Sequence, residues 1–281
     1  MISIIIPTFN EESVIGNCLD TLLQQSITDF EIILVDDGST DNTRQIVSKI
    51  AKENGQLNKI MILKQNHKGA GAARNMGAFR SKADIFVFVD ADMTFDKNFL
   101  RDLVSPIQEG KCRGTFSKNE YVANWDNVWS RCWNYNQNWQ DKKRHPENYP
   151  DEQPVFRAIL ASEFKKVNGF DPGGYDDDWS LSRKLGYMAV TVDGAHFYHK
   201  NPDNLKEIFF HAIWSGKRKY KLGLLGVLVS IVRASLPISI TVGIFKSIKK
   251  LTWQFVIFKI IYDLGLVFGM IMFYVNRKGY K

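Results

Sequence analysis

The sequence predicts an α/β fold in which a mostly parallel sheet is flanked by helices and followed by apolar helices at the carboxyl end. Two observations lead to this prediction. The first hundred residues alternate short apolar runs with segments of helical periodicity, and the residues after 221 contain two long apolar runs. A composition of 44% hydrophobic and 24% charged residues over 281 positions is that of an ordinary globular protein, which argues against a mainly disordered chain.

Four short runs predict the strands of the sheet. They cover residues 3–6, 31–35, 59–63 and 85–89, and each is nearly continuously apolar. Strands that are covered by helices on both faces have this pattern, whereas strands with one solvated face alternate apolar and polar residues. We therefore expect these four strands at the centre of the fold.

Helices are predicted between these strands. Asn10 is a candidate N-cap, followed by Glu11 and Glu12 in the first turn. A second helix follows Asp41, and a third covers about 71–81. Strands that alternate with helices predict parallel pairing through right-handed crossovers. The apolar positions of the first helix lie on one face: Val14, Ile15, Cys18, Leu19, Leu22 and Leu23.

The strands are followed by polar and mostly acidic segments, at 7–12, 36–41 and 90–92. In open parallel sheets, ligands bind beyond the carboxyl ends of the strands. Three acidic segments at one edge would repel each other unless a cation or hydrogen-bond donors offset their charge. This edge is the predicted binding site, although for Asn10 and Asp41 a capping role explains the residue equally well.

The acidic pair Asp90 and Asp92 predicts a divalent metal site. Both carboxylates follow directly after the buried run 85–89. Hard oxygen ligands of this kind suit Mg²⁺ or Mn²⁺, with a diphosphate completing the coordination shell.

The glycine-rich segment 69–77 argues against a dinucleotide-binding site. Arg74 stands where the third glycine of that fingerprint would be, and several residues separate the segment from the preceding strand. An arginine near the start of a helix can instead reach a diphosphate or the carboxylates beside it. The small residues around it, Ala70, Ala72 and Ala73, are typical of close helix packing.

Four segments, 4–12, 35–41, 71–75 and 89–93, closely resemble in order and spacing the family 2 glycosyltransferases of GT-A fold. The resemblance weakens beyond residue 110. It implies transfer of a sugar from a nucleotide diphosphate donor with inversion of configuration, and a metal and diphosphate held by Asp90 and Asp92. It also implies a nucleotide-sugar site that includes Pro7, Thr8, Asn10, Glu12, Asp37, Gly38, Arg74, Asn75, Asp90 and Ala91.

The resemblance extends to a second acidic motif and a histidine. Three consecutive aspartates, Asp176, Asp177 and Asp178, stand where the family usually has an E-D pair opening a helix. We predict Asp177 as the general base, with Asp176 and Asp178 as alternatives, while a role as capping or solvated acids stays open. His199 resembles a histidine that reaches the metal in related enzymes, and a purely structural role is equally open.

An aromatic segment is the region where an acceptor would be recognised. Aromatic faces beside Asn and Gln side chains suit sugar stacking. However, Trp125, Trp129 and Trp133 recur at four-residue spacing, which favours one face of a packed helix.

The positive charge of the protein belongs to its carboxyl-terminal part. Residues 200–281 contain 14 Lys and Arg against 3 acidic residues, whereas the remainder has 23 basic and 27 acidic residues, within a total net charge of +7. These basic residues are interleaved with long apolar runs, which indicates binding to lipid head groups and argues against nucleic acid.

The two apolar runs, 222–245 and 252–275, are each long enough to cross a bilayer. Basic clusters precede, join and follow them, at 217–221, 246–250 and 277–281. A spanning hairpin would place the joining cluster on the opposite side, against the positive-inside tendency. Helices that lie in the interface, or that dip in and return, keep every cluster on the cytoplasmic face and are favoured. Packing against the catalytic domain as ordinary core is the third option.

The sequence thus predicts three parts: a nucleotide-sugar-binding half at 1–110, an acceptor-binding and catalytic half at 111–221, and a membrane-associated tail at 222–281. Three cysteines without paired spacing fit a reducing compartment, and no secretory signal precedes the first strand. We therefore expect a protein at the cell membrane whose catalytic part faces the cytoplasm.

The acceptor and the reaction class leave alternatives. A hydroxyl acceptor needs a base, whereas a polyprenyl phosphate does not, and a membrane tail makes a membrane lipid or lipid-linked acceptor plausible. A sugar nucleotidyltransferase would also use acids and a metal, but would release pyrophosphate. A non-catalytic, membrane-tethered partner that keeps the fold is the third possibility.

Overall fold

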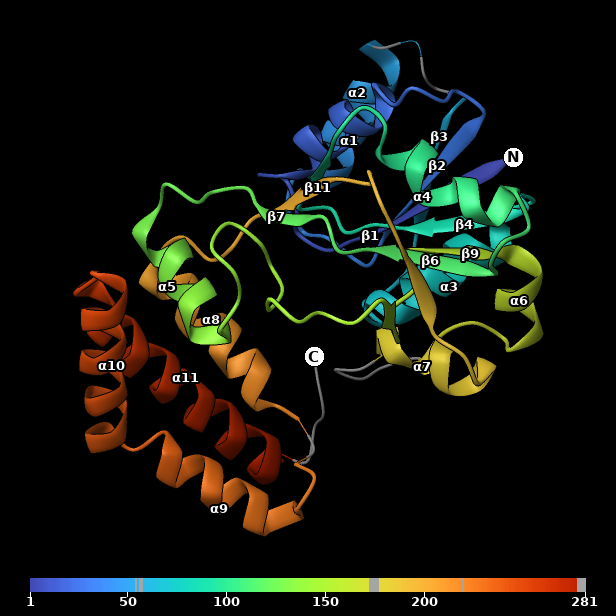
Figure 1. Cartoon of the computed structure of the whole chain (residues 1–281). Helices are drawn as coiled ribbons and strands as arrows, with labels where there is room; N and C mark the ends of the chain where they lie inside the picture. The colour runs from blue at the N-terminus through green and yellow to red at the C-terminus, as the bar shows by residue number, and fades with distance from the viewer. Residues whose placement is uncertain (54, 56–57, 172–176, 219, 277–281) are drawn as a thin grey trace. The chain divides into compact units, whose positions relative to one another are not determined.

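The computed structural model describes residues 1–53, 55, 58–171, 177–218 and 220–276, and Figure 1 shows the course of the chain. The chain forms two compact units. Unit 1 comprises Met1–Tyr121 and Asn148–His199, and unit 2 comprises Val122–Glu147 and Lys200–Lys281.

Unit 1 is built on a sheet of eight strands in the order β3-β2-β1-β4-β9-β6-β10-β8. Its first half consists of the four strands expected from the apolar runs, and all three pairs between them are parallel. These strands are β1 Ile2–Thr8, β2 Phe30–Asp36, β3 Ile60–Lys64 and β4 Ile85–Phe88. Beyond β4 the sheet contains both parallel and antiparallel pairs, so the expected parallel arrangement holds fully only for the first half.

The second half of the sheet changes direction at β9, which is antiparallel to both β4 and β6. β10 is parallel to β6 and antiparallel to β8. A smaller sheet of three strands has the order β5-β11-β7. The bounds of these strands are β5 Met93–Phe95, β6 Gly114–Ser117, β7 Glu120–Val122, β8 Glu152–Gln153, β9 Ala158–Leu160, β10 Ala189–Val192 and β11 Phe197–His199.

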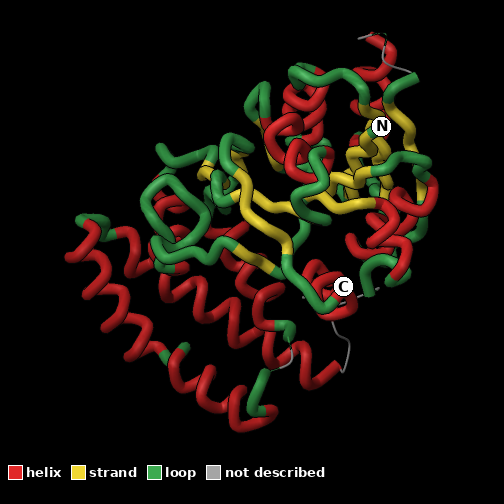
Figure 2. The backbone as a smooth tube through the Cα atoms, turned by 45° about the vertical axis from the view of Figure 1, so that its right-hand side comes forward, coloured by secondary structure: helices red, strands yellow, loops and turns green. Residues whose placement is uncertain are grey.

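Helices flank the large sheet (Figure 2). The central strands have apolar side chains on both of their faces, and each face packs against its own set of helices. Ile4 and Ile6 pack in the cluster that contains α1, α2 and α4 side chains, whereas Ile5 packs in the cluster of α3, α6 and α7. The bounds are α1 Ile15–Leu23, α2 Thr43–Glu53, α3 Ala70–Arg80, α4 Phe99–Gln108, α6 Ala161–Lys166 and α7 Asp177–Leu185.

The predicted capping role of Asn10 is wrong. Helix α1 begins only at Ile15, and Asn10 has a left-handed backbone with φ of 59°. Its Oδ1 accepts a hydrogen bond of 2.8 Å from the Thr40 backbone N–H, so the side chain joins two loops instead of capping a helix. The apolar face of α1 is confirmed, with Leu19 and Leu22 fully buried.

Unit 2 is helical and has an aromatic core. Trp133, Phe255 and Phe258 are buried together, and Trp125 and Trp129 pack against them, which confirms that the three tryptophans pack in a core. Trp129 and Trp133 lie on the helix Val128–Gln137, whereas Trp125 precedes this helix, so the predicted helix face holds only for two of the three. Its helices are α5 Val128–Gln137, α8 Leu205–Gly216, α9 Gly223–Arg233, α10 Leu236–Lys250 and α11 Gln254–Asn276.

This shared core explains why the two units differ from the three predicted parts. The sequence predicts residues 122–147 within the acceptor half, but their aromatic side chains pack with those of α8 and α11. Residues 111–121 and 148–199 complete the sheets of unit 1. Adjacency in sequence did not indicate which elements share a core.

Helices α8 and α11 approach each other at glycines. A Cβ on Gly265 would lie 2.6 Å from the Phe209 carbonyl oxygen, and one on Gly269 would lie 2.1 Å from that of Ile213. Two glycines four residues apart let helix backbones come this close.

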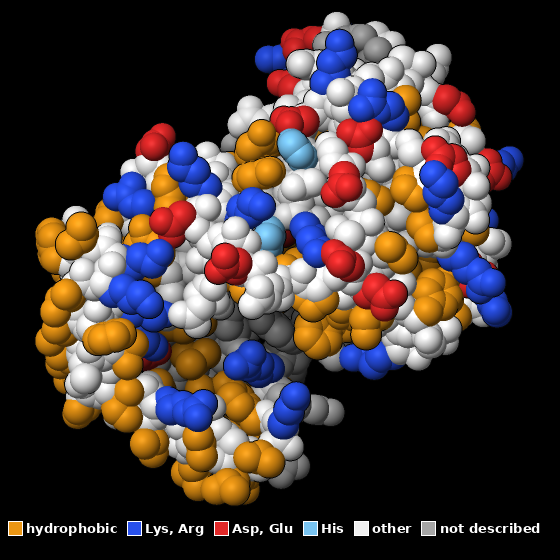
Figure 3. Space-filling view, in the orientation of Figure 1, with side chains coloured by type: hydrophobic (Ala, Val, Ile, Leu, Met, Phe, Trp, Pro, Cys, Tyr) orange, Lys and Arg blue, Asp and Glu red, His pale blue; other side chains and the backbone are white. Residues whose placement is uncertain are grey.

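The first apolar run of the tail is not one helix. It forms α9 and α10, which meet at a bend of 59°, whereas the second run forms the single helix α11. Among the described residues, α11 alone is long and apolar enough to cross a membrane, and the bent pair is a second candidate if it counts as one span. Hydrophobic side chains gather over unit 2 in Figure 3, many of them on α9 and α10.

Part of the basic cluster between the two runs has partners inside unit 2. Lys246 Nζ donates to the Tyr135 carbonyl at 2.6 Å and to Asn138 Oδ1 at 2.8 Å, at the carboxyl end of α5. Lys250 pairs with Asp141 at 2.9 Å. These two lysines are therefore weaker evidence for lipid head groups than their place in the sequence indicated.

We predict that Gly269→Ala lowers the free energy of unfolding of unit 2 by about 1–3 kcal/mol, because its Cβ would meet the Ile213 backbone. The intrinsic helix preference of alanine acts in the opposite direction by about 1 kcal/mol. Thermal unfolding in mild detergent, followed by tryptophan fluorescence, measures the change. Gly16→Ala in α1 is the control, because the nearest side-chain atom there, Ile50 Cδ1, lies 3.9 Å away. Equal stability of Gly269→Ala and wild type would contradict the close-packing argument.

Candidate functional site

The carboxyl ends of β1, β2 and β4 surround a cavity of about 310 Å³ in unit 1. Strand β1 lies between β2 and β4, and the chain reaches its two neighbours in opposite directions, which is where open α/β sheets bind ligands. The cavity is lined by Pro7, Thr8, Phe9, Glu11, Asp37, His67, Gly69, Ala70, Asp90, Ala91, Asp92 and His199.

Asp37 fixes one wall of the cavity. Its buried carboxylate accepts hydrogen bonds from Gln65 Nε2 at 2.7 Å and from the backbone N–H groups of Lys68 and Gly69 at 2.7 and 2.8 Å. The next residue, Gly38, has φ of 89°, and a Cβ there would lie 3.2 Å from the His67 backbone nitrogen. Together they hold the loop before α3 against the end of β2.

The same wall carries a stacked ring pair. Phe9 and His67 have ring centroids 4.1 Å apart and an interplanar angle of 27°. His67 Nδ1 is also 2.9 Å from Asp37 Oδ2, so the ring is held at a defined position. A flat, partly exposed aromatic surface of this kind can stack against a planar ligand.

Asn10 and Glu12 are not among the residues that line the cavity. Glu12 Oε2 accepts from both the backbone N–H and the side-chain amide of Asn42 at 2.9 Å, at the start of α2. Asp41 accepts from the Thr43 backbone N–H at 3.0 Å, which supports its helix-start role. These side chains therefore join the loops that follow β1 and β2 and do not line the cavity.

Arg74 connects the end of β4 with α7. Its buried guanidinium lies 2.7 Å from Asp90 Oδ1 and also pairs with Asp178. Arg157 lies 3.4 Å from the other oxygen of Asp90. Burial of the Asp90 carboxyl opposes its ionisation, but the charges of Arg74 and Arg157 outweigh this and hold its pKa well below the usual range.

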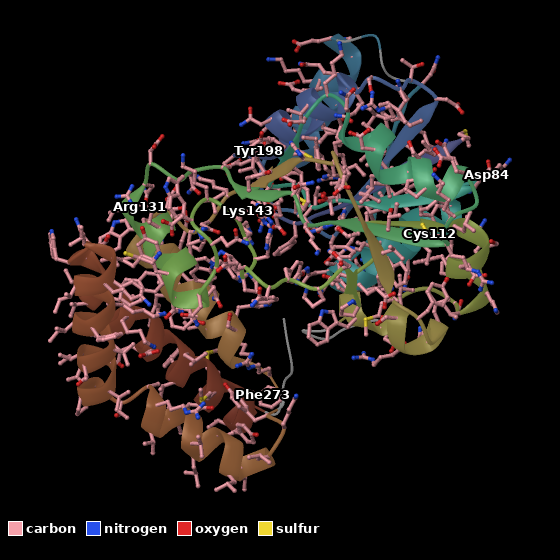
Figure 4. All side chains as sticks on the ribbon, in the orientation of Figure 1. Asp84, Cys112, Arg131, Lys143, Tyr198 and Phe273 are labelled. Atoms are coloured by element: carbon pink, nitrogen blue, oxygen red, sulfur yellow. The ribbon has the colours of Figure 1, made fainter. Side chains whose placement is uncertain are left out.

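Asp92 and His199 are brought together by the small sheet. β5 and β11 are antiparallel, with His199 opposite Met93, the residue after Asp92. Asp92 Oδ2 lies 2.9 Å from His199 Nε2, and Glu120 Oε1 lies 3.0 Å from His199 Nδ1. Tyr198, labelled in Figure 4, marks the strand that carries this histidine.

Glu11 lines the cavity although it is not among the site residues predicted from the sequence. Burial and the negative charges of Asp92 and Asp90 raise the pKa of its carboxyl to about 7. The pKa values of the acids at this edge therefore shift in opposite directions, because Asp90 has two arginine partners while Glu11 faces mainly other acids.

Asn75 anchors the chain at Phe170. Its side-chain amide donates to the Phe170 carbonyl and accepts from the Phe170 N–H, both at 2.8 Å. Asn75 does not line the cavity, although the resemblance implies that it belongs to the nucleotide-sugar site. Of the three candidate bases, Asp178 pairs with Arg74, Asp177 begins α7, and Asp176 lies outside the described residues.

The residues fit a divalent ion that is shared with a ligand. Among the described residues, no group of three or more His, Cys, Asp and Glu side chains can hold a metal. However, neighbouring ligands of an octahedral ion with bonds of about 2.1 Å lie about 3 Å apart, and Asp92 Oδ2 and His199 Nε2 have this separation. Two protein ligands completed by phosphate oxygens are the usual arrangement for Mg²⁺ at nucleotide sites. Asp90, also predicted as a ligand, faces two arginines instead.

The sequence profile of glycosyl transferase family 2 matches residues 3–167. The chain belongs to this family. It is 34% identical over 234 residues to the glycosyltransferase GlyG of Streptococcus pneumoniae serotype 4, and the match covers 76% of each chain.

Two solved structures show that this family member has the GT-A fold. The mannosyltransferase PcManGT from Pyrobaculum calidifontis, in complex with GDP-Man and Mn²⁺, superposes with a TM-score of 0.61 at 16% identity, covering 99% of this chain and 88% of that one. Residues 1–349 of Staphylococcus aureus TarS, in complex with UDP-GlcNAc, give a TM-score of 0.57 at 20% identity. That match covers 75% of this chain and 65% of the TarS chain.

The sequence indicated the strand-end residues of the site but missed those that arrive from elsewhere. Seven of the predicted site residues line the cavity: Pro7, Thr8, Asp37, Asp90, Ala91, Asp92 and His199. Phe9 and Glu11 lie inside the segment 4–12 that resembles the family. With Pro7 they are alternate residues, and this spacing is the one signal in the sequence that they lie on the same side of the chain. The remaining missed residues carry no local signal: His67, Glu120 and Arg157.

We predict that Glu11→Gln stabilises the metal-free protein at high pH. The folded state holds the Glu11 proton up to a pKa of about 7, whereas an unperturbed Glu side chain has a pKa of 4.5. Wild-type stability therefore falls as pH rises between these two values, by up to about 3 kcal/mol, and the variant lacks this loss. Melting temperatures of both proteins in a chelator, at pH 4 and pH 8, measure the difference. The two proteins should match at pH 4, and an equal difference at both pH values would contradict the assigned shift.

Proposed function

We propose that the protein transfers a glycosyl residue from a nucleotide diphosphate sugar to an acceptor, with inversion and with assistance from Mg²⁺ or Mn²⁺. The observation that carries this proposal is the paired Asp92 and His199 in the lining of a cavity formed by strand ends. Family membership supports sugar transfer, and the two structural neighbours are described with nucleotide sugars.

The donor would occupy the cavity with its base against the stacked rings of Phe9 and His67. Gly69 and Ala70 at the start of α3 line the cavity, and the first N–H groups of a helix favour a diphosphate. Arg74 is predicted from sequence to position the donor. Because its guanidinium is held between Asp90 and Asp178, we assign it to holding these carboxylates in place rather than to direct phosphate binding.

Asp92 and His199 would hold the divalent ion, which supplies positive charge that stabilises the departing diphosphate. Asp90, kept ionised by its arginine partners, would accept hydrogen bonds from donor hydroxyl groups or bound water. The Mn²⁺ described for PcManGT supports this choice of metal for the protein.

The general base is proposed to be Asp177. It begins α7, where the helix dipole favours an ionised carboxylate. Asp178 follows as an alternative, but its ion pair with Arg74 disfavours a role that needs a free carboxylate. With a hydroxyl acceptor the base removes the proton as oxygen attacks the anomeric carbon, and with a polyprenyl phosphate acceptor no base is required.

We propose that unit 2 associates with a membrane and that the catalytic unit faces the cytoplasm. Exposed apolar side chains on α9 and α10 support this, including Leu225 and Leu228 at 60% and 59% exposure. The bend between α9 and α10 favours helices in the interface over a straight span. A membrane lipid or lipid-linked acceptor is consistent with this position.

The first test removes the proposed ligand and the proposed base. Asp92→Ala and Asp177→Ala should each lower transfer at least about 100-fold while the proteins stay folded. Membranes are incubated with a panel of labelled UDP- and GDP-sugars, and label entering the organic-solvent phase is counted. Asp20→Ala, an exposed acid on α1, is the control.

Full activity in both variants would refute the site. Loss with Asp92→Ala alone would favour a phosphate acceptor, and release of pyrophosphate would favour the alternative of a nucleotidyltransferase. No transfer or nucleotide binding by the wild type would favour a non-catalytic, membrane-tethered partner.

The second test concerns the membrane. We expect the full chain to float with phosphatidylcholine vesicles that contain phosphatidylglycerol, and the double variant Leu225→Glu with Leu228→Glu to float several-fold less, because two charges would enter the apolar surface. Met188→Glu is the control, since Met188 is 49% exposed but lies in unit 1. Equal flotation of the double variant and wild type would exclude α9 from the contact.

A further inference from the structure

His199 lies between two carboxylates, and this placement sets a requirement on its protons. Nδ1 faces Glu120 at 3.0 Å and Nε2 faces Asp92 at 2.9 Å. A neutral imidazole has one N–H, so one of its nitrogens must present a lone pair to a carboxylate. Either a second ring proton or a metal cation between that nitrogen and its carboxylate removes this repulsion.

The two carboxylates differ in their surroundings. Asp92 lines the cavity, whereas Glu120 is not one of the residues described there, and it reaches the ring from β7 on the other side. The side chain of Glu120 is 21% exposed and that of Asp92 is 35% exposed. A ligand in the cavity can therefore reach Nε2 and Asp92, while Glu120 stays behind the ring.

We infer that Glu120 is a positioning residue for the metal site. Its carboxylate accepts a hydrogen bond from His199 Nδ1–H, which leaves the lone pair of Nε2 directed toward Asp92 and the cavity. A carboxylate behind a ligating histidine fixes its tautomer and ring orientation and increases its basicity as a ligand. This inference rests on the proposed function, because it assigns Glu120 to the same metal that Asp92 and His199 would hold.

The small sheet gives this role a structural basis. Glu120 and His199 lie on β7 and β11, which are neighbours in the sheet, and β11 also pairs with β5 directly after Asp92. All three side chains are thus fixed by one sheet of three strands. A histidine held from both sides loses little conformational freedom when it binds a metal.

The experiment measures Mn²⁺ binding to the full chain in detergent with saturating UDP or GDP, whichever the wild type binds, by the loss of the free Mn²⁺ electron paramagnetic resonance signal. Glu120→Gln should weaken Mn²⁺ binding roughly 10- to 100-fold. Glu152→Gln on β8, an exposed glutamate in unit 1, is the matched control and should bind Mn²⁺ as the wild type does. Thermal unfolding without metal should show both variants folded.

Unchanged Mn²⁺ affinity in folded Glu120→Gln overturns the inference but leaves the proposed function intact. Absence of Mn²⁺ binding in the wild type itself overturns the metal assignment, and the inference with it. If Glu120→Gln does not fold, nitrogen-15 spectra of the wild type with Mg²⁺ and nucleotide decide the question. The inference expects the His199 proton on Nδ1, and a proton on Nε2 overturns it.

Discussion

The buried guanidinium of Arg74 is the interaction on which the arrangement of the candidate site depends. It comes from α3, and it binds Asp90 at the end of β4 and Asp178 on α7, 104 residues further along the chain. A buried arginine is stable only with such partners, and each of the acids needs a cation nearby to stay ionised at this crowded edge. One side chain therefore links the end of β4, which lies shortly before the proposed metal ligand Asp92, to α7, which carries the candidate bases Asp177 and Asp178.

The acids of this edge have different partners, and the difference separates their chemistry. Asp90 has two arginines, Asp92 has a histidine, and Glu11 has only a weak contribution from a histidine against the charges of its neighbours. The pKa of Asp90 is lowered and that of Glu11 is raised to about 7. A divalent ion beside Asp92 would lower the pKa of Glu11, because it adds positive charge where the carboxylates now repel each other. Binding of the ion and ionisation of Glu11 should therefore favour each other.

The sequence predicted the central strands, their parallel order and the acidic edge, because these features arise from short runs whose pattern is local. It could not predict the partners of His199. Glu120 is 79 residues away from it and Asp92 is 107 away, and only the pairing of three short strands brings them together. Asn10 shows the opposite error: a local capping pattern was present, but a hydrogen bond to Thr40 in a distant loop determined its conformation. Local patterns indicate which residues follow the strands at the edge of the sheet. Long-range strand pairing decides which of their side chains come into contact.

The charged residues of α11 illustrate the same limit for the membrane question. Lys259 and Asp263 interrupt the apolar run and, taken alone, argue against a helix in hydrocarbon. In unit 2 they pair with each other at 2.6 Å, and Asp263 also accepts a hydrogen bond of 2.6 Å from Ser239 on α10. Because Asp263 is buried at 2% exposure, this charge faces the neighbouring helix and would face it whether the surroundings are water or lipid. The polar residues of α11 thus explain how α10 and α11 pack together, while the exposed apolar side chains of α9 and α10 carry the information about the membrane.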